Sequence, residues 1–175
     1  MNLMLEKTIH ERGSYLRDAV FSASDGVVTT FAVVAGSTGA SLNPKIVLIL
    51  GFANLFADGI SMASGTYLGV KSEEDFEHEE GGRHGKEGSA IKQSVVVFVS
   101  FVIAVLFPLL PYLSSIDGSF SASVVTVVLI LFGVGMLRSY FTRKNAIKSG
   151  IEMLLVGGLA AVVAYYTGFF IDKIV

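Results

Sequence analysis

The sequence predicts an all-α integral membrane protein with five spanning helices. Of its 175 residues, 52% are hydrophobic and 16% are charged, and the mean hydropathy is +0.65. A typical soluble domain is about 25% charged. The charged residues gather in a few places, and between them lie five apolar stretches that reach the roughly 20 residues a helix needs to cross a bilayer. We therefore expect a single membrane domain over residues 1–175.

The five stretches are expected to be helices, because they are too long and alternate too poorly for barrel strands. A helix also satisfies its backbone N–H groups within its own segment, as the bilayer requires. We place the spans at residues 16–37, 45–70, 91–113, 119–141 and 147–172, with one hydrophilic insert at 72–89. Pro108 and Pro111 are expected to kink or end the third span. At the start of the fifth span we expect Glu152 to pair with Lys148.

The distribution of basic residues predicts the orientation. With a cytoplasmic N-terminus, 11 of the 13 Lys and Arg residues fall on the cytoplasmic side, and only Lys45 and Lys173 fall outside. The positive-inside rule favours this orientation, and five spans then place the C-terminus outside. Residues 1–15 lack the continuous apolar core of a secretory signal peptide. The missing signal and the short chain favour a prokaryotic plasma (inner) membrane over a vacuolar membrane.

Charge and composition argue against several other classes of protein. A net charge of -2 provides no overall basic field for nucleic acid. Without cysteine there is no disulfide framework, thiolate metal site or cysteine nucleophile. The ionisable groups within the spans do not form a nucleophile, base and orienting set, and there is no glycine-rich loop to hold a phosphate. We therefore expect neither an enzyme nor a permanently bound cofactor.

Two aspartates in the first span give the first functional signal. A charged side chain at the centre of a bilayer costs about 2.5–3.5 kcal/mol on insertion scales. Asp18 lies near the inner boundary beside Arg17, with which it can pair, and Asp25 lies almost two turns deeper in the polar run 22–26. Their separation of seven residues directs both to one side of the helix. At its depth Asp25 is expected to be functional or to form a buried pair.

The second span carries a polar stripe. Asn54, Asp58 and Met62 follow one another at intervals of four residues and so share one face. Counted from the inner ends of their spans, Asp25 and Met62 both lie roughly 12–14 Å deep, and we expect them to meet. A carboxylate with a thioether suits a borderline-soft divalent first-row metal. The alternatives are that Met62 only packs and that Asp58 belongs to a buried pair.

Small residues form a ridge on the same span, at Ala53, Ala57, Ser61, Gly65 and Gly69. Such a ridge allows two helix backbones to approach closely. Its partner is either a second copy of the chain or a similar series, Ala32, Gly36 and Ala40, in the first span. Because five helices enclose little interior, a polar pathway fits more naturally between two copies, and we predict a homodimer.

The hydrophilic insert is acidic and contains histidine. Residues 71–88 hold seven carboxylates together with His78 and His84. The candidate metal ligands are Glu73, Glu77, His78 and Glu80, of which the three glutamates share a helical stripe that continues from the second span. Carboxylate and imidazole groups suit Fe²⁺, Mn²⁺, Zn²⁺ or Co²⁺. The alternative is a solvated loop whose charges only keep it in water.

Together these residues resemble the vacuolar iron transporter family, which includes nodulin-like relatives. The resemblance covers nearly the whole chain from about Tyr15. In the first span it rests on Arg17-Asp18 followed by Ser24-Asp25-Gly26. In the second span it rests on ADGISMASGTYLGVKSE at 57–73, where Ser61-Met62, Gly65 and Tyr67 are similar to the family's Ser-Met-x-x-Gly-x-Tyr stretch. PLLPY at 108–112 and GIEMLLVGGLAAVVAYYTG at 150–168 also resemble family sequence.

The resemblance implies export of Fe²⁺, and often Mn²⁺, from the cytosol in exchange for protons. It also implies a dimer whose pathway runs along the first and second helices at the interface. Asp25 and Met62 match the family's pore aspartate and methionine, and Asp18 matches its earlier first-span aspartate. The expected pathway residues are Asp18, Asp25, Asn54, Asp58 and Met62, and the expected partners are a divalent metal ion, protons, lipid and a second protomer.

Two departures from the family pattern affect this hypothesis. The family often carries a glutamate eight residues before the pore methionine, where this chain has Asn54. Either proton coupling is altered here, or Asp58 replaces that glutamate. The family's long cytoplasmic metal-binding helices are missing, so metal capture depends on the short insert. The alternative functions are a non-transporting membrane scaffold or metal sensor, and a passive divalent cation pore.

Overall fold

The computed structural model describes residues 2–79, 89–114 and 119–174, with side chains from His10 onward. These residues form five helices: α1 (Asn2–Gly39), α2 (Pro44–Glu79), α3 (Ala90–Leu113), α4 (Ser119–Thr142) and α5 (Ala146–Ile174). All of them are long and apolar enough to cross a membrane. The predicted all-α fold with five spanning helices is confirmed.

The helix bounds follow the predicted spans except at two ends: α1 begins at Asn2, fourteen residues before the predicted start of the first span, and α2 ends later than predicted. α2 continues nine residues beyond its predicted end, because residues 70–79 are rich in good helix formers and contain no glycine or proline. Part of the predicted insert is therefore a helical extension of the second span. Pro108 and Pro111 lie inside α3, which continues through both and ends at Leu113, two residues after the second proline.

The α1–α2 and α4–α5 turns are built in the same way. Each contains one non-glycine residue in the left-handed conformation, Ser41 (φ 56°) and Arg143 (φ 54°). The N–H of the next residue donates to the carbonyl five residues earlier, which is the Schellman ending of a helix. Asn43 and Asn145 then cap the following helices by accepting backbone N–H groups through Oδ1, at 2.9 and 3.0 Å. These short turns hold both helix pairs antiparallel.

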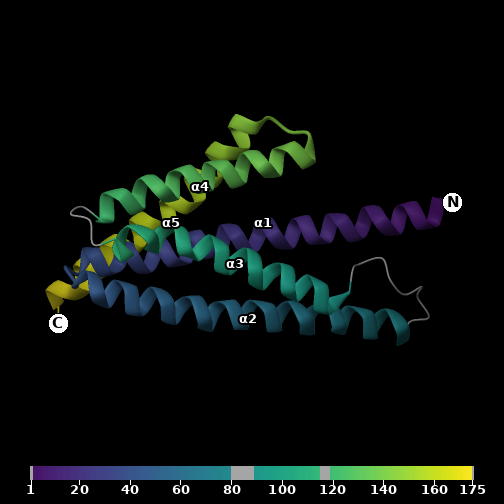
Figure 1. Ribbon diagram of the computed structural model, residues 1–175, viewed down its shortest axis with the longest axis horizontal. Helices are drawn as coiled ribbons and strands as arrows, with labels where there is room; N and C mark the ends of the chain where they lie inside the picture. Colours follow the sequence, from purple (N-terminus) through teal and green to yellow (C-terminus); the bar gives the residue numbers. More distant parts are fainter. Residues whose placement is uncertain (1, 80–88, 115–118, 175) are drawn as a thin grey trace.

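Helices α1 and α3 are central in the bundle (Figure 1). α1 contacts each of the other four helices, whereas α2 packs only on α1 and α3, and α5 only on α1 and α4. The N-terminus, the last turns of α2 and the α4–α5 turn lie at one end, here called the N-terminal end (Figure 1). The C-terminus and the α1–α2 turn lie at the opposite, C-terminal end.

The core lies mainly between α1 and α3, where Val27, Val34, Phe101 and Val105 are fully buried. Large apolar side chains such as Leu155 on α5 are instead exposed on the outer surface of the bundle. Lipid chains are as apolar as these side chains, so membrane helices associate through close packing rather than through the hydrophobic effect. The outward apolar surface is that of a protein that meets lipid.

Candidate functional site

The candidate site contains two Asp-Gly dipeptides, one on α1 and one on α2, which pack against the aromatic residue Phe101 of α3. A Cβ on Gly26 would lie 3.0 Å from the carbonyl oxygen of Phe101, and a Cβ on Gly59 would lie 3.5 Å from the ring of the same residue. The two glycines therefore allow both helices to rest on the fully buried Phe101. Asp25 and Asp58 directly precede these glycines. This packing role of Gly26 and Gly59 was not predicted from the sequence, although both glycines directly follow an aspartate, a repetition that could have indicated it.

Asp25 and Asp58 lie at one depth in the bundle. Asp25 is fourteen residues before the end of α1, and Asp58 is fourteen residues after the start of α2. Both are therefore about 21 Å from the short turn that joins these antiparallel helices. Asp58 acts on Asp25 electrostatically, as two nearby carboxylates do. The site thus places two acidic groups, from different helices, near the middle of the bundle.

Met62 lies further along α2 than the depth of Asp25, with which it was expected to be level. It lies one helical turn beyond Asp58, or about 6 Å nearer the N-terminal end, so Asp25 is level with Asp58 rather than with Met62. The difference arises because the α1–α2 turn sets the register of the two helices, whereas the expectation counted from assumed membrane boundaries. Met62 is partly buried and packs against the hydrophobic core.

The two first-span aspartates have different surroundings. Asp18 is buried, and its Oδ1 accepts a hydrogen bond from Nε of Arg17 at 3.1 Å. The boundary pair considered for Asp18 is therefore present. Asp25 is half-buried, and within the described part of the chain it forms no ion pair with a basic side chain. Its carboxylate thus remains available to a cation, whereas that of Asp18 already has one.

The polar stripe of α2 lies on the border of a packed face and an open one. Asn54, Asp58 and Met62 are all half-buried. On one side of the stripe, Leu55 and Gly59 are buried against α3. The Nδ2 of Asn54 is buried and has no hydrogen-bond partner among the residues described.

The small-residue ridge is the open face. All five of its residues are exposed, and a Cβ added to Gly65 or Gly69 would meet no atom within 4 Å. The first-span series does not cover it, because Gly36 faces the backbone of Ala164 and Gly168 on α5. The alternative of a contact between the ridge and that series is therefore wrong.

The acidic extension of α2 forms a helical surface without a closed metal cage. Glu73, Glu77 and His78 lie on it, and of these Glu77 is half-buried and the others are exposed. Among the described residues, no group of three His, Asp or Glu side chains is placed to hold a metal ion. Glu80 and His84 fall outside the described residues. The ligand role of this segment stays a prediction.

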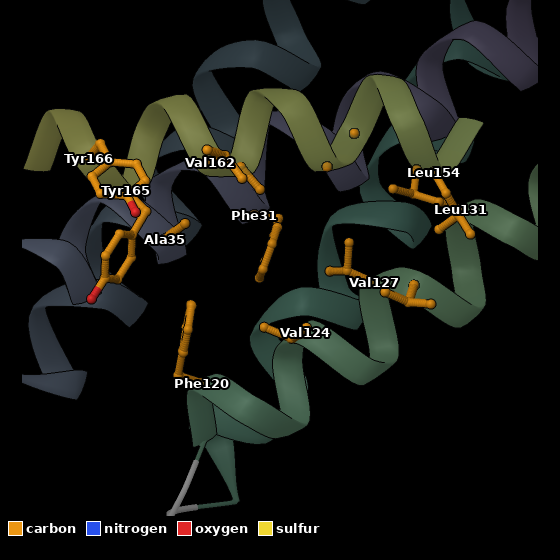
Figure 2. Close-up of a pocket in the computed structure, with 14 residues that line it drawn as sticks. Phe31, Ala35, Phe120, Val124, Val127, Leu131, Leu154, Val162, Tyr165 and Tyr166 are labelled. Atoms are coloured by element: carbon orange, nitrogen blue, oxygen red, sulfur yellow. The ribbon is translucent and has the colours of Figure 1, made fainter. Parts of the chain in front are cut away.

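Two cavities lie between α1, α4 and α5. The first, of about 420 Å³, is apolar. Figure 2 shows Phe31 and Phe120 beside it and Tyr165 and Tyr166 near one end. Its lining contains no carboxylate, imidazole or thioether, so it offers none of the metal ligands expected here.

The second cavity, of about 690 Å³, lies nearer the N-terminal end and is called the arginine groove. Its polar lining includes Arg17 and Asp25 of α1 and Arg138 of α4. Nη2 of Arg138 is 3.6 Å from Oε2 of Glu152 on α5. The predicted partner of Glu152, Lys148, is wrong, because the packing of α4 against α5 brings Arg138 closer. Asp25 therefore lies at the depth of Asp58 and also lines a groove that contains two arginines.

Comparison with known proteins agrees with this architecture. The sequence matches the family model described as the VIT family over residues 16–87 and 78–169. The chain belongs to the VIT family. The VIT family match includes both Asp-Gly dipeptides and all five helices, and the protein is accordingly an integral, multi-pass membrane protein.

Several curated proteins are similar over most of their length. Vacuolar iron transporter homolog 3 of Arabidopsis thaliana is 31% identical over 180 residues, which cover 94% of this chain and 90% of that protein. The vacuolar iron transporter of Toxoplasma gondii is 26% identical over 237 residues (97% and 78%). Vacuolar iron transporter 1 of Oryza sativa subsp. japonica is 28% identical over 212 residues (87% and 84%).

The alignments with these relatives differ in length. The alignment with the Toxoplasma protein is longer than this chain, so it includes residues that this chain lacks, whereas the alignment with the Arabidopsis protein is nearly the length of this chain. The two parts of the family match meet at 78–87, between α2 and α3.

Proposed function

We propose that this protein exports Fe²⁺, Mn²⁺ or both from the cytosol across a membrane in exchange for protons. Family membership and relatives named as vacuolar iron transporters support transport of a metal ion. The observation that carries the proposal is the pair of carboxylates, Asp25 and Asp58, at one depth near the middle of spanning helices. A charge kept at that depth is expensive, and it is retained where an ion passes.

In this proposal the N-terminal end is cytoplasmic. The acidic extension of α2 then projects into the cytosol and raises the local concentration of divalent cations. Glu73, Glu77 and His78, with Glu80, provide the first oxygen and nitrogen ligands. Met62 is one turn along α2 towards the carboxylate pair, so a cation moving inward reaches a thioether and then two carboxylates.

The pathway is completed by a second protomer. Two copies that meet along the open ridge of α2 bring two polar stripes together, since each stripe borders its ridge. Four carboxylates then share one small volume, and their mutual repulsion is relieved by a dication or by protons. Metal and proton therefore compete for the same oxygens, which is the physical basis of exchange. In this proposal Asp58 provides the carboxylate for proton coupling that the family often provides with a glutamate at the position of Asn54.

The test is metal uptake into proteoliposomes that contain the purified protein and carry an imposed pH gradient. We expect Fe²⁺ uptake that depends on the gradient, and a fall of about tenfold or more in Asp25→Asn, because the variant keeps the shape but loses the charge. Asp172→Asn, on the exposed last turn of α5, is the matched control and should keep the flux. Unchanged flux in Asp25→Asn would remove the mechanism, and flux that ignores the pH gradient would favour a passive pore.

A further inference from the structure

The arginine groove combines cationic side chains with apolar walls. Arg17 and Arg138 line it from α1 and α4, and Phe21 and Val156 line it from α1 and α5. Phe21 is 63% exposed and Val156 is 64% exposed. Because these residues belong to spanning helices, their exposed surfaces meet the acyl region of the bilayer. The groove is therefore open to lipid from the side.

Both guanidinium groups keep hydrogen-bonding capacity beyond their present partners. Arg17 uses Nε for Asp18, and Arg138 uses Nη2 for Glu152, which is itself exposed. A guanidinium carries five N–H donors, so each arginine can bind another anion without releasing its carboxylate. Paired guanidinium donors suit the tetrahedral oxygens of a phosphate group.

The neighbouring α4–α5 turn adds further positive charge. Arg143, Lys144 and Lys148 are all exposed there, close to the end of α4 that carries Arg138. α5 begins at this turn, where Oδ1 of Asn145 already accepts the N–H groups of Ile147 and Lys148, so the added attraction for an anion comes from the basic side chains. Basic pockets between spanning helices at one membrane surface are typical sites for acidic headgroups.

We propose that the arginine groove binds one anionic glycerophospholipid from the leaflet at the N-terminal end. Arg17 and Arg138 hold its phosphate, and one acyl chain lies along Phe21 and Val156 towards the depth of Asp25. Asp25 is eight residues from Arg17, or about 12 Å along α1, so an acyl chain easily reaches it. The seated lipid covers this side of Asp25 and leaves its other side open towards Asp58.

The chemistry of the groove favours a lipid over a metal ion or a free anion. The lining also includes the carboxylate of Asp25 and the thioether of Met153, but Arg17 and Arg138 place two positive charges in the same groove, which disfavours a dication there. A free phosphate would use the arginines but would leave the apolar walls uncovered. The two arginines and the apolar side chains of the groove together match a molecule that has both a phosphate group and a hydrocarbon chain.

The experiment measures lipid binding and does not depend on transport. The whole protein, purified in neutral detergent, is titrated with dioleoylphosphatidylglycerol, dioleoylphosphatidylcholine or inorganic phosphate. Thermal unfolding and native mass spectrometry are read out. We expect phosphatidylglycerol to bind about tenfold more tightly than phosphatidylcholine, with one lipid retained per protomer, because only the former carries net negative charge. Inorganic phosphate should leave the unfolding temperature unchanged.

Two kinds of variant test the two parts of the groove. Arg138→Gln should reduce the preference for phosphatidylglycerol to about twofold or less, whereas Lys92→Gln, which removes an exposed charge near the same end of α3, should keep it. Val156→Phe should weaken the binding of both lipids, because the larger side chain occupies space in the groove. Val163→Phe, at a similarly exposed position of α5 outside the groove, should leave the binding of both lipids unchanged. Neither groove variant removes a buried group, so both are expected to fold.

Three results would overturn the proposal. They are equal binding of the two lipids by the parent protein, a preference that survives Arg138→Gln together with unchanged binding of both lipids by Val156→Phe, and stabilisation by inorganic phosphate as strong as that by phosphatidylglycerol. All of these measurements are made on protein with Asp25 intact and need no flux, so the lipid site and the transport mechanism fail separately.

Discussion

Helices α2 and α5 flank the bundle on opposite sides, and both are rich in small residues, but they use them differently. On α5, a Cβ added to Gly168 would overlap the backbone carbonyl of Gly36, and one added to Gly157 would overlap the side chain of Leu131. On α2, the ridge glycines Gly65 and Gly69 face no atom within 4 Å. Gly157 and Gly168 of α5 are thus closely packed within the protomer, whereas the glycines of the α2 ridge are open.

α2 and α5 also carry opposite charges at the N-terminal end of the bundle. α2 ends there in an acidic extension that includes Glu73 and Glu77, and α5 begins there beside the basic residues Arg143, Lys144 and Lys148. A dication is drawn to the first and an acidic headgroup to the second. α5 is thus packed mainly within the protomer, and our proposals give α5 a role in lipid binding and α2 roles in ion binding and dimer formation.

The largest expected effect is on the scaffold. Gly168→Ala should lower the free energy of unfolding by about 3 kcal/mol or more, because its methyl group meets backbone that cannot move aside. Gly158→Ala, on the same helix, has nothing within 4 Å and should be neutral or slightly stabilising. Reversible unfolding in mixed detergent measures both. Equal stability of the two variants would contradict a close packing of Gly168 against α1.

The next effect is on assembly. Gly65→Leu combined with Gly69→Leu should leave the protomer folded and weaken the dimer at least about tenfold, because the bulky side chains keep the ridges apart. Gly133→Leu, on an exposed and equally open position of α4, is the matched control. Light scattering of the purified protein over a range of detergent dilutions reports the association. A double variant that dimerises as well as the parent would contradict a ridge interface.

A smaller effect is expected from the inward glycines beside the two aspartates. Gly26→Ala should destabilise the protein by about 1–3 kcal/mol, because its methyl group would press on the backbone oxygen of Phe101. Gly59→Ala should be milder, since its nearest neighbours, in the ring of Phe98, can shift. Unfolding and metal uptake are measured on the same preparations. The reverse order of the two variants would show that Phe101 does not support the site.

The smallest effect concerns the acidic extension. Glu73→Gln with Glu77→Gln should raise the metal concentration for half-maximal uptake by about three- to fivefold without lowering the maximal rate, because these groups capture the ion but lie outside the carboxylate pair. Asp75→Asn with Glu79→Gln removes the same charge from another face of α2. Equal effects of the two pairs would indicate general attraction rather than ligation.

Five helices and most of their ends were predictable from the sequence, because helix formation in a bilayer is a local matter. The length of each apolar stretch and the need to satisfy backbone groups within it decide the spans. The same local reasoning identified Asp25 and Asp58 as costly charges and the ridge of α2 as a helix-packing surface. It also identified the family, whose motifs lie along the chain.

The tertiary structure alone decided which residues meet. The α1–α2 turn sets Asp25 level with Asp58 instead of Met62. Packing on Phe101 gives Gly26 and Gly59 their role, and the arrangement of α4 and α5 gives Glu152 its partner. The helical periodicity of the sequence predicts the face of a helix on which a side chain lies. Which helix packs against that face depends on register and on close contacts between distant segments. Those contacts arise only when the helices assemble.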